Sequence, residues 1–548
     1  MNKQYAYIAQ LYSIRNHYGN DAAAKKVRLL NDIRHQQAMH KKAVQLYHDC
    51  LLFLIAYPDS KTIYSIAIQS LQQLYLHIQS NEKLKKSLYN SGITHSTICA
   101  AFSFEIVKWL RKINPTEIKL YSFNASDSQI QSILSVVMPK VESEILQDAN
   151  AEWRGWLKRI MKEEEDLLDM LIAIFDGSTI RPEAKDELWN AIGINVEINF
   201  STHCKIPGHL IKPFYHRSLI GKHQKKHLPV LKPLRIQLNK KEAEQVIECS
   251  RKVLIGHLRE IDPITFTAAG LIDYYQLPRG ISIALMGMVP ERRHPIDSYF
   301  GYMVYKNGLP IAYAGSWILF NSGRIGLNVF PAYRGGESQY IFQQVLQLHQ
   351  QVYNLKRFTV DPYQIGKENT DGIHSGAFWV YHHAGFRPIL KAQQEIAEAE
   401  ALKIKTTPGY RSTKNILKIL ADSRLQLMYN KSAVKFDATD LSIVWSVILE
   451  KKYNNNRRRL NDNSIKKLAS LLQLKNYQEE KMRFILQNWY MLLVANEKEL
   501  AENKSLQKIL KKLFMLKATG SEEEYIMEMQ KSVLLRKFIE DLLEEFGG

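Results

Sequence analysis

The sequence has 548 residues, which is enough for three or four domains of ordinary size. Its hydrophobic fraction of 45% and its charged fraction of 24% are ordinary for a globular protein, so each domain can bury a core of its own. The net charge of +19, from 74 basic and 55 acidic residues, fits an anionic partner such as nucleic acid, a phosphorylated cofactor or a membrane surface. It fits equally well a lysine-rich composition with no anionic target.

The cysteines and the apolar runs exclude several classes of protein. Cys50, Cys99, Cys204 and Cys249 lie far apart and form no Cys-x-x-Cys pair, so we expect neither a disulfide framework nor a metal site. This pattern is typical of a reducing compartment. No signal peptide is evident, and the longest apolar run near the start, residues 50–57, is too short to cross a bilayer. We therefore expect a cytoplasmic protein without a membrane partner.

Residues 1–200 form a region that we expect to be mostly helical. Long side chains and alanines dominate residues 21–46, and Ser60 is placed to cap a helix whose apolar residues run to Leu76. Further amphipathic stretches cover residues 96–112 and 142–175. The second contains an acidic run, residues 163–166, which we interpret as a solvated face. No set of residues here looks catalytic, so packing or binding of a protein partner is the expected role.

A basic segment, residues 201–241, follows as a separate connector. Its part from Lys205 to Lys241 contains no Asp or Glu, and four prolines argue against a helix. Lys222, Lys225 and Lys226 cluster among four histidines that lack the spacing of a metal site. Two interpretations stay open. The segment could bind RNA through its phosphate backbone, or it could be a connector that crosses the domain surface.

Residues 242–390 mix helix and strand patterns. A helical stretch up to residue 275 precedes an apolar strand at 281–289 and a charged, proline-flanked loop at 290–295. In that loop the adjacent Arg292 and Arg293 suit binding of a phosphate or carboxylate, while pairing with Glu291 in a surface turn is the other interpretation.

The stretch from 298 to 389 carries the strongest pattern. Two apolar runs, 302–305 and 311–319, flank Asn307-Gly308, a dipeptide that accepts the positive φ of a tight hairpin. A third strand is predicted at 325–330, a helix at 338–353, a fourth strand at 357–360 and a last helix at 375–383. The predicted order is strand, hairpin, strand, strand, glycine turn, helix, strand, helix.

Two short motifs in this stretch resemble the GNAT acyltransferase superfamily. Pro331-Ala332-Tyr333-Arg334-Gly335 is similar to the Pro-x-x-Arg-Gly that closes the family's central strand. Residues 377–386 are similar to the family's Ala-x-x-x-Tyr-x-x-x-Gly-Phe ending, with Tyr381 at the tyrosine position. The resemblance covers about a quarter of the chain. It implies an α+β fold, in which a central GNAT-like mixed sheet with flanking helices lies between N-terminal and C-terminal mostly helical regions.

The resemblance also implies a chemistry. It implies acetyl-CoA or another acyl-CoA as cofactor, with the phosphates held at a helix N-terminus by Arg334, Gly335 and Gly336. It makes Tyr381 the acid that protonates the departing thiolate, unless Tyr381 is only a packed aromatic. Ser338, in the first helical turn, could donate its hydroxyl to a phosphate. The acceptor would be the amine of a small molecule or peptide.

The base that deprotonates the acceptor is less clearly indicated. Asp361 and Glu337 are the nearest carboxylates along the chain, and Asn328, His374 and His382 are weaker candidates. The polar loop after residue 360 supplies candidates for an acceptor pocket, since substrate sites are often built on such loops. These candidates are Tyr363, Gln364 and Lys367.

Three positions depart from the family pattern. Glu337 and Gln339 stand where the phosphate loop of the family carries small residues, and His374 stands where it carries Asn. The Glu337 carboxylate would repel a pyrophosphate bound at this loop. Two alternatives therefore stay open. One is a transferase that uses aminoacyl-tRNA, which would also explain the basic charge, and the other is a non-catalytic scaffold with a GNAT-like core.

Residues 391–548 are predicted to be helical again. The expected helices cover residues 392–401, 414–427, 464–474, 477–494, 505–517 and 522–546. A polar break is expected at 451–463. We interpret this region as a packing surface or as a surface for a protein partner.

Overall fold

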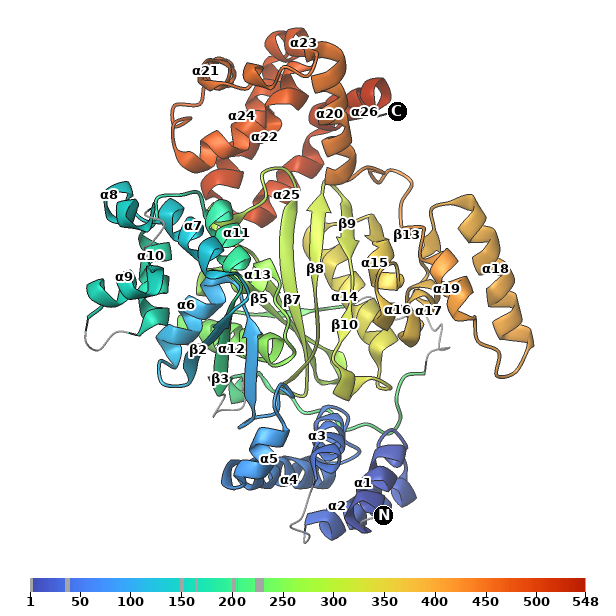
Figure 1. Cartoon of the computed structure of the whole chain (residues 1–548). Coiled ribbons are helices and arrows are strands. Elements are labelled where there is room, and N and C mark those ends of the chain that lie inside the picture. The colour runs from blue at the N-terminus through green and yellow to red at the C-terminus, as the bar shows by residue number, and fades with distance from the viewer. Residues whose placement is uncertain are drawn as a thin grey trace.

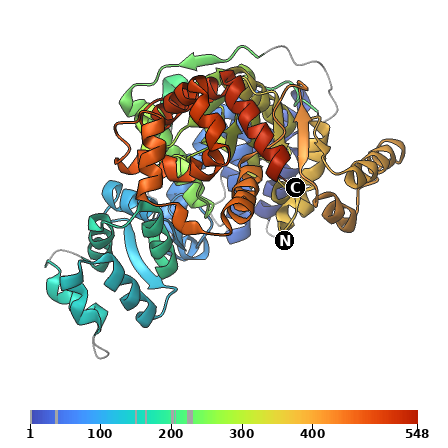
Figure 2. The same cartoon turned by 90° about the horizontal axis from the view of Figure 1, so that it is seen from above.

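The fold is mixed α and β, with a central multistranded sheet flanked by helices, as the sequence predicts. The computed structural model describes residues 3–34, 40–147, 152–162, 166–199, 204, 206–221 and 231–547. Figure 1 shows the sheet between a group of N-terminal helices and a group of C-terminal helices, at opposite ends of the molecule. In Figure 2, residues 97–199 project to one side of the molecule and the helices α18 and α19 to the other.

The central sheet has ten strands in the order β12-β13-β11-β9-β8-β7-β6-β5-β4, with β10 paired to β8 beside this path. All neighbours are antiparallel except β9 and β11, which are parallel. The strands are β4 (Leu234–Ile236), β5 (Ile272–Leu277), β6 (Ile281–Met286), β7 (Ser298–Lys306), β8 (Leu309–Leu319), β9 (Ser322–Ile325), β10 (Asn328–Val329), β11 (Arg357–Val360), β12 (Arg387–Pro388) and β13 (Leu425–Met428). The predicted strands at 281–289, 302–305, 311–319 and 357–360 are confirmed, and the one at 325–330 is divided between β9 and β10.

Helices cover both faces of the sheet because its residues alternate between them. On one face, His349 of α14 (Ser338–Tyr353) contacts the ring of Tyr302 and the hydroxyl of Ser316. On the other face, the hydroxyl of Ser250 in α12 (Lys240–Gly256) forms a hydrogen bond with the hydroxyl of Tyr305, and α13 (Asp262–Thr265) packs on Gly301. Three short helices follow β11, namely α15 (Pro362–Ile365), α16 (Thr370–Ser375) and α17 (Ala377–His383).

The β7–β8 hairpin turns at Asn307 and Gly308, whose φ angles of 47° and 84° are those the dipeptide predicts. This turn is buried, since Asn307 is only 2% exposed. Its side-chain oxygen accepts a hydrogen bond from the Phe214 amide (2.8 Å), and its nitrogen donates to the Ala56 carbonyl (3.1 Å) at the end of α3 (Lys41–Ala56). The hairpin tip thus joins the N-terminal helices and the connector to the sheet.

The N-terminal helices share one apolar core with the sheet. They are α1 (Lys3–Ile14), α2 (Asn20–Arg34), α3, α4 (Lys61–Ser80) and α5 (Glu82–Ser87). The predicted cap is confirmed, because the Ser60 hydroxyl accepts a hydrogen bond from the Ile63 amide at the start of α4.

Residues 97–199 have a separate core and a small antiparallel sheet in the order β1-β3-β2, which the sequence did not predict. Its strands are β1 (Thr97–Ala101), β2 (Ile118–Phe123) and β3 (Ile194–Asn199). The helices around it are α6 (Phe104–Ile113), α7 (Asp127–Val137), α8 (Lys140–Ser143), α9 (Trp153–Ile160), α10 (Leu167–Gly177) and α11 (Pro182–Ile192). The expected continuous helix over 142–175 is therefore wrong. Of the acidic run, Glu163, Glu164 and Glu165 lie outside the described residues, and Asp166 caps α10 and pairs with Arg111.

The C-terminal helices from α20 onward form a third apolar core. The helices after β12 are α18 (Lys391–Thr406), α19 (Lys414–Leu420), α20 (Ala438–Tyr453), α21 (Asp462–Leu471), α22 (Glu480–Val494), α23 (Glu497–Glu502), α24 (Lys504–Thr519), α25 (Glu522–Lys531) and α26 (Val533–Phe546). Two expectations are wrong here. The helix predicted at 414–427 ends at Leu420 and β13 follows it, and the one predicted at 522–546 is interrupted at Ser532.

The charged loop at 290–295 connects the sheet to α11 on one side and to the C-terminal helices on the other through ion pairs. Arg292 forms an ion pair with Asp186 of α11. The guanidinium of Arg293 is nearly buried, 3.5 Å from the Glu522 carboxylate, and donates to the Gly520 carbonyl (2.7 Å). The two arginines thus bind carboxylates, as one interpretation expected, but these carboxylates belong to the protein's own flanking regions.

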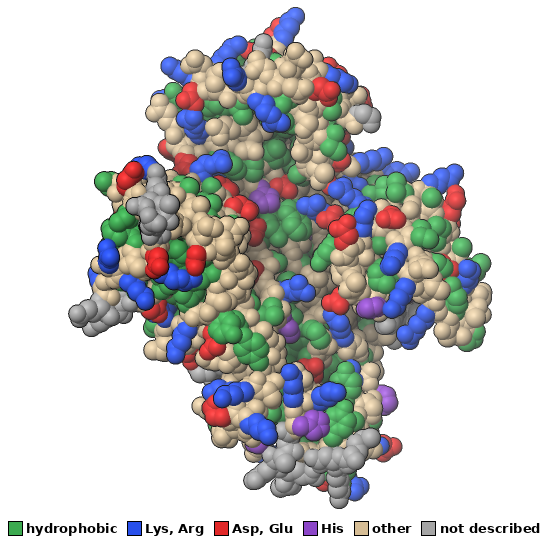
Figure 3. Space-filling view, in the orientation of Figure 1, with side chains coloured by type: hydrophobic (Ala, Val, Ile, Leu, Met, Phe, Trp, Pro, Cys, Tyr) green, Lys and Arg blue, Asp and Glu red, His purple; other side chains and the backbone are tan. Residues whose placement is uncertain are grey.

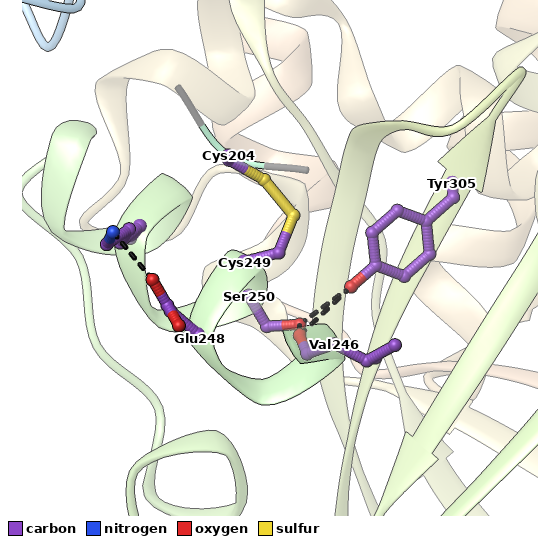
Figure 4. The surroundings of a disulfide bond; sticks show 7 residues. Cys204, Val246, Glu248, Cys249, Ser250 and Tyr305 are labelled. Atoms are coloured by element: carbon purple, nitrogen blue, oxygen red, sulfur yellow. Dashed lines mark hydrogen bonds and ion pairs between the residues drawn. A yellow bond between two sulfur atoms is a disulfide. The ribbon is translucent and has the colours of Figure 1, made fainter. Parts of the chain in front are cut away.

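A disulfide joins Cys204 to Cys249, with their Cα atoms 4.9 Å apart, whereas the sequence led us to expect none (Figure 4). Spacing along the chain could not reveal this pair, because 45 residues separate the two cysteines and only the fold brings them together. The bond ties the connector to α12, beside the hydrogen bond between Ser250 and Tyr305. Within the described ranges no helix is long and apolar enough to cross a membrane.

We predict that Asn307→Gly lowers the free energy of unfolding by about 2–4 kcal/mol, because glycine keeps the left-handed backbone but leaves the amide and carbonyl partners of Asn307 unsatisfied. Urea unfolding of the full chain measures this change. The matched control is Asn454→Gly at the exposed end of α20, where φ is also 47°, and we expect it to stay within about 0.5 kcal/mol. Equal effects of the two changes would contradict the role of the hairpin tip.

Candidate functional site

The candidate site lies where the sheet opens between β9 and β11. The parallel pairing of these strands ends at Arg324 and Thr359, after which the chain continues into β10, which pairs only with β8. We call the residues at this opening, Gly326 and Leu327 on one side and Asp361 on the other, the fork. Peptide groups in a fork are not satisfied by a strand ladder, so side chains, water or a ligand must satisfy them.

Tyr381 of α17 lies at the fork. Its hydroxyl oxygen accepts a hydrogen bond of 3.1 Å from the Leu327 amide, and its ring packs against Phe342 and Phe386. Burial raises the pKa of Tyr381 to about 12, although the Leu327 amide opposes this shift. The phenol is therefore protonated at neutral pH, as a proton donor must be.

The other side of the fork is polar. The Asp361 carboxylate lies 3.5 Å from Nε of Arg324 and 3.8 Å from Nε of Arg424, and about a third of its side chain is exposed (32%). Gln364, one turn later in α15, packs against Gly326, since a Cβ at Gly326 would lie 3.0 Å from its side chain. Gln364, one of the predicted pocket residues, is thus in contact with the fork.

A stacked pair of aromatic rings lies on the sheet beside Arg324, the partner of Asp361 in the fork. The Trp317 ring stacks on Tyr299 with centroids 4.2 Å apart, and the Arg324 guanidinium lies 4.5 Å from its centroid. Figure 3 shows the surface hollowed above the region where β7, β8 and β9 lie in Figure 1, between the flanking lobes.

The loop before α14 forms the second part of the candidate site. Arg334 and Gly335 are exposed, Gly335 has a φ of 88°, and the first turn of α14 carries neither an acidic residue nor a side-chain cap. The guanidinium of Arg15 approaches Gly335, with Nη2 3.7 Å from the position of a Cβ. Helix N–H groups and two guanidinium groups together make this loop attractive to an anion.

Glu337 does not point toward that anion position. Its side chain is fully buried, 3.1 Å from Nζ of Lys306 and 3.4 Å from Nε of Arg279. The Ile220 amide also donates to it (3.0 Å), and Nε2 of His216 lies 3.4 Å away. We call Glu337, Lys306, Arg279 and His216 the buried ion cluster.

Charge explains why the cluster is stable. Burial alone would raise the pKa of Glu337, but His216, Lys306 and Arg279 offset this and hold it well below its usual value. Burial lowers the pKa of Lys306 to about 8, although the Glu337 charge opposes the shift, and burial also keeps His216 neutral by lowering its pKa. One carboxylate thus faces two cations, Lys306 and Arg279. Because the Glu337 carboxylate has no exposed surface, we do not retain it as a base.

The remaining predicted residues lie at several places around the site. Gly336 packs on the ring of Tyr57, where a Cβ would come within 2.5 Å, and Ser338 is half-buried. Tyr363 is exposed and Lys367 lies 3.6 Å from Asp422. The other base candidates are Asn328 on β10, His374, whose exposed ring is 3.2 Å from Lys414, and His382 on α17.

Sequence reasoning missed Arg15, Tyr302, Lys306 and Arg279. Tyr302 and Lys306 lie in or beside the strand predicted at 302–305, and Arg15 and Arg279 lie outside the two motifs. No local pattern marks any of the four as part of a site. The basic segment is only partly described, since Lys222, Lys225 and Lys226 lie outside the described residues. Where it is described, it packs on the protein, with Ile206, Leu210, His216 and Leu231 buried. RNA binding by this segment stays a prediction.

The chain was compared with family models, curated proteins and solved structures. No family model, no curated protein and no solved structure matches the chain.

We predict that Glu337→Gln destabilises the protein by about 3–5 kcal/mol, because it leaves Lys306 and Arg279 buried without a counter-charge. The pKa of Glu337 in the folded protein lies below the unfolded value of about 4.3, so its contribution is present above that pH and is lost as the pH falls through the folded value. Urea unfolding at several pH values should therefore show a smaller difference between variant and wild type at acid pH. The exposed Glu398→Gln in α18 is the control, and a pH-independent difference for Glu337→Gln would contradict this assignment.

Proposed function

We propose that the protein is a GNAT-like acyltransferase that moves an acyl group from an acyl-CoA-type carrier to the amine of a small molecule or peptide. The observation that carries the proposal is the contact of Tyr381 with the peptide amide of the fork, in the same chain segment that leads into α14. A thioester at the fork and its phosphates at the start of α14 would place the two ends of one long carrier on adjacent parts of this segment.

The chemistry assigns a role to each group. The acceptor amine attacks the thioester carbonyl carbon, the C–N bond forms, and the C–S bond breaks. Tyr381 gives its proton to the departing thiolate. The proton that the amine loses goes to Asp361, whose carboxylate is partly exposed at the fork, or to water in the hollow.

The anion site supports a phosphorylated carrier despite Glu337. In the sequence this carboxylate argues against a pyrophosphate, yet in the fold it is turned into the buried ion cluster and outnumbered by cations. Arg334 of this loop is exposed, and the guanidinium of Arg15 lies close to Gly335. The N-terminal helices thereby contribute a residue to the carrier site.

We predict that Tyr381→Phe lowers kcat by about 10²–10⁴-fold while the affinity for the carrier barely changes, since only the proton donor is removed. The assay is release of free thiol from acetyl-CoA with a panel of amines, together with calorimetry. Tyr353→Phe is the control, because that buried hydroxyl has no hydrogen-bond partner among the described residues. An active Tyr381→Phe enzyme would exclude Tyr381 as the acid. If the wild type neither binds nor cleaves any acyl-CoA, the proposal is wrong, and aminoacyl-tRNA transfer or a scaffold role would replace it.

We also predict that Arg15→Ala and Arg334→Ala each weaken acetyl-CoA binding by about 10-fold or more, because each removes a charge-assisted contact to phosphate. Calorimetry measures the binding, and Arg28→Ala, at an exposed position of α2, is the control. Arginine variants are preferable to Gly336→Val, whose side chain would collide with Tyr57 and disturb folding as well as binding. Unchanged affinity in both arginine variants would remove the phosphate site from this loop.

A further inference from the structure

One peptide unit of the fork is held from both sides by tyrosines. The Gly326 carbonyl and the Leu327 amide belong to the same peptide group. Tyr302 donates its hydroxyl hydrogen to that carbonyl, and the amide donates to the hydroxyl oxygen of Tyr381 at 3.1 Å. Because the C=O and N–H of a trans peptide point in opposite directions, the first bond determines where the second can point.

Tyr302 is well placed to hold this peptide. It lies on β7, and its partner on the intervening strand β8 is Ala314, whose small side chain lets the tyrosine ring pass toward the fork. Tyr302 is fully buried, and the ring of His349 packs against it with centroids 5.4 Å apart. His349 is itself held by the Ser316 hydroxyl and the Val345 carbonyl. The hydroxyl of Tyr302 therefore has a fixed position.

We propose that Tyr302 is a positioning residue that orients the peptide between Gly326 and Leu327 so that its amide supports Tyr381 as the proton donor. The inference rests on the proposed acyl transfer. When the Tyr381 proton moves to the departing thiolate, a phenolate is left in a buried place. The Leu327 amide stabilises that phenolate, and water in the hollow later returns the proton. If the peptide turned over, the Gly326 carbonyl oxygen would face the phenolate and repel it.

The first test is kinetic. Tyr302→Phe keeps the ring and removes only the bond to Gly326, so kcat for acetyl-CoA should fall by about 10- to 100-fold, with KM within about twofold, as for loss of a hydrogen bond to a charged group. The alkaline limit of the pH–rate profile should move to higher pH, because the Tyr381 phenolate loses its amide donor. In a Tyr381→Phe background the same change should have no further effect. An equal loss in both backgrounds would overturn the inference.

The second test does not depend on acyl transfer. Hydrogen exchange of the Leu327 amide, measured by mass spectrometry of peptides from the full chain, should accelerate by about tenfold or more in Tyr302→Phe. The matched control is Tyr305→Phe on the same strand, whose equally buried hydroxyl bonds Ser250 of α12 instead. Unchanged exchange in Tyr302→Phe would overturn the inference. Accelerated exchange in a protein without acyltransferase activity would support the positioning of the peptide and refute the proposed function.

Discussion

The buried carboxylate of Glu337 is the contact on which the rest of the structure depends. It brings together the end of β7 through Lys306, the turn after β5 through Arg279, and the connector through His216 and the Ile220 amide. Ions in a protein interior lose their hydration and remain stable there only with close partners of opposite charge. The cluster therefore requires all of these segments to be in place at once. It fixes the loop before α14 at the point where the N-terminal helices reach the sheet.

The change of strand partner after β9 creates the unusual hydrogen bonding of the fork. An unbroken ladder would satisfy the peptide between Gly326 and Leu327 with another strand, and no side chain could then use its amide. In the fork, this peptide forms hydrogen bonds with Tyr302 and Tyr381 instead. Arg424 contacts Asp361 of the fork, and the flanking lobes border the hollow above the sheet. The choice of acceptor would therefore depend on those lobes, whereas protonation of the departing thiolate would depend on the fork.

Local patterns predicted those parts of the fold that local physics determines. Asn307-Gly308 predicts the hairpin, and apolar spacing predicts α14 with its observed ends. The same reasoning mistook β13 for helix, because its four residues follow a helical run and become a strand only by pairing with β11 and β12. For the candidate site, the resemblance is what pointed to Tyr381 and to the loop before α14, and both stay predictions. Contacts between distant segments decided the rest, such as Arg15 beside Gly335 and the two cations that face Glu337.

Hydrogen exchange of the full chain with and without acetyl-CoA tests the proposed carrier site most directly. A carrier with its thioester at the fork and its phosphates at the start of α14 should slow exchange in residues 324–330 and 334–341 together. It should leave the C-terminal helices α21–α24 unchanged, because they belong to a separate core. Joint protection of the two segments is the result we expect. No protection, or protection of only one segment, at acetyl-CoA concentrations that saturate acyl-CoA enzymes would contradict the assignment of one carrier to both.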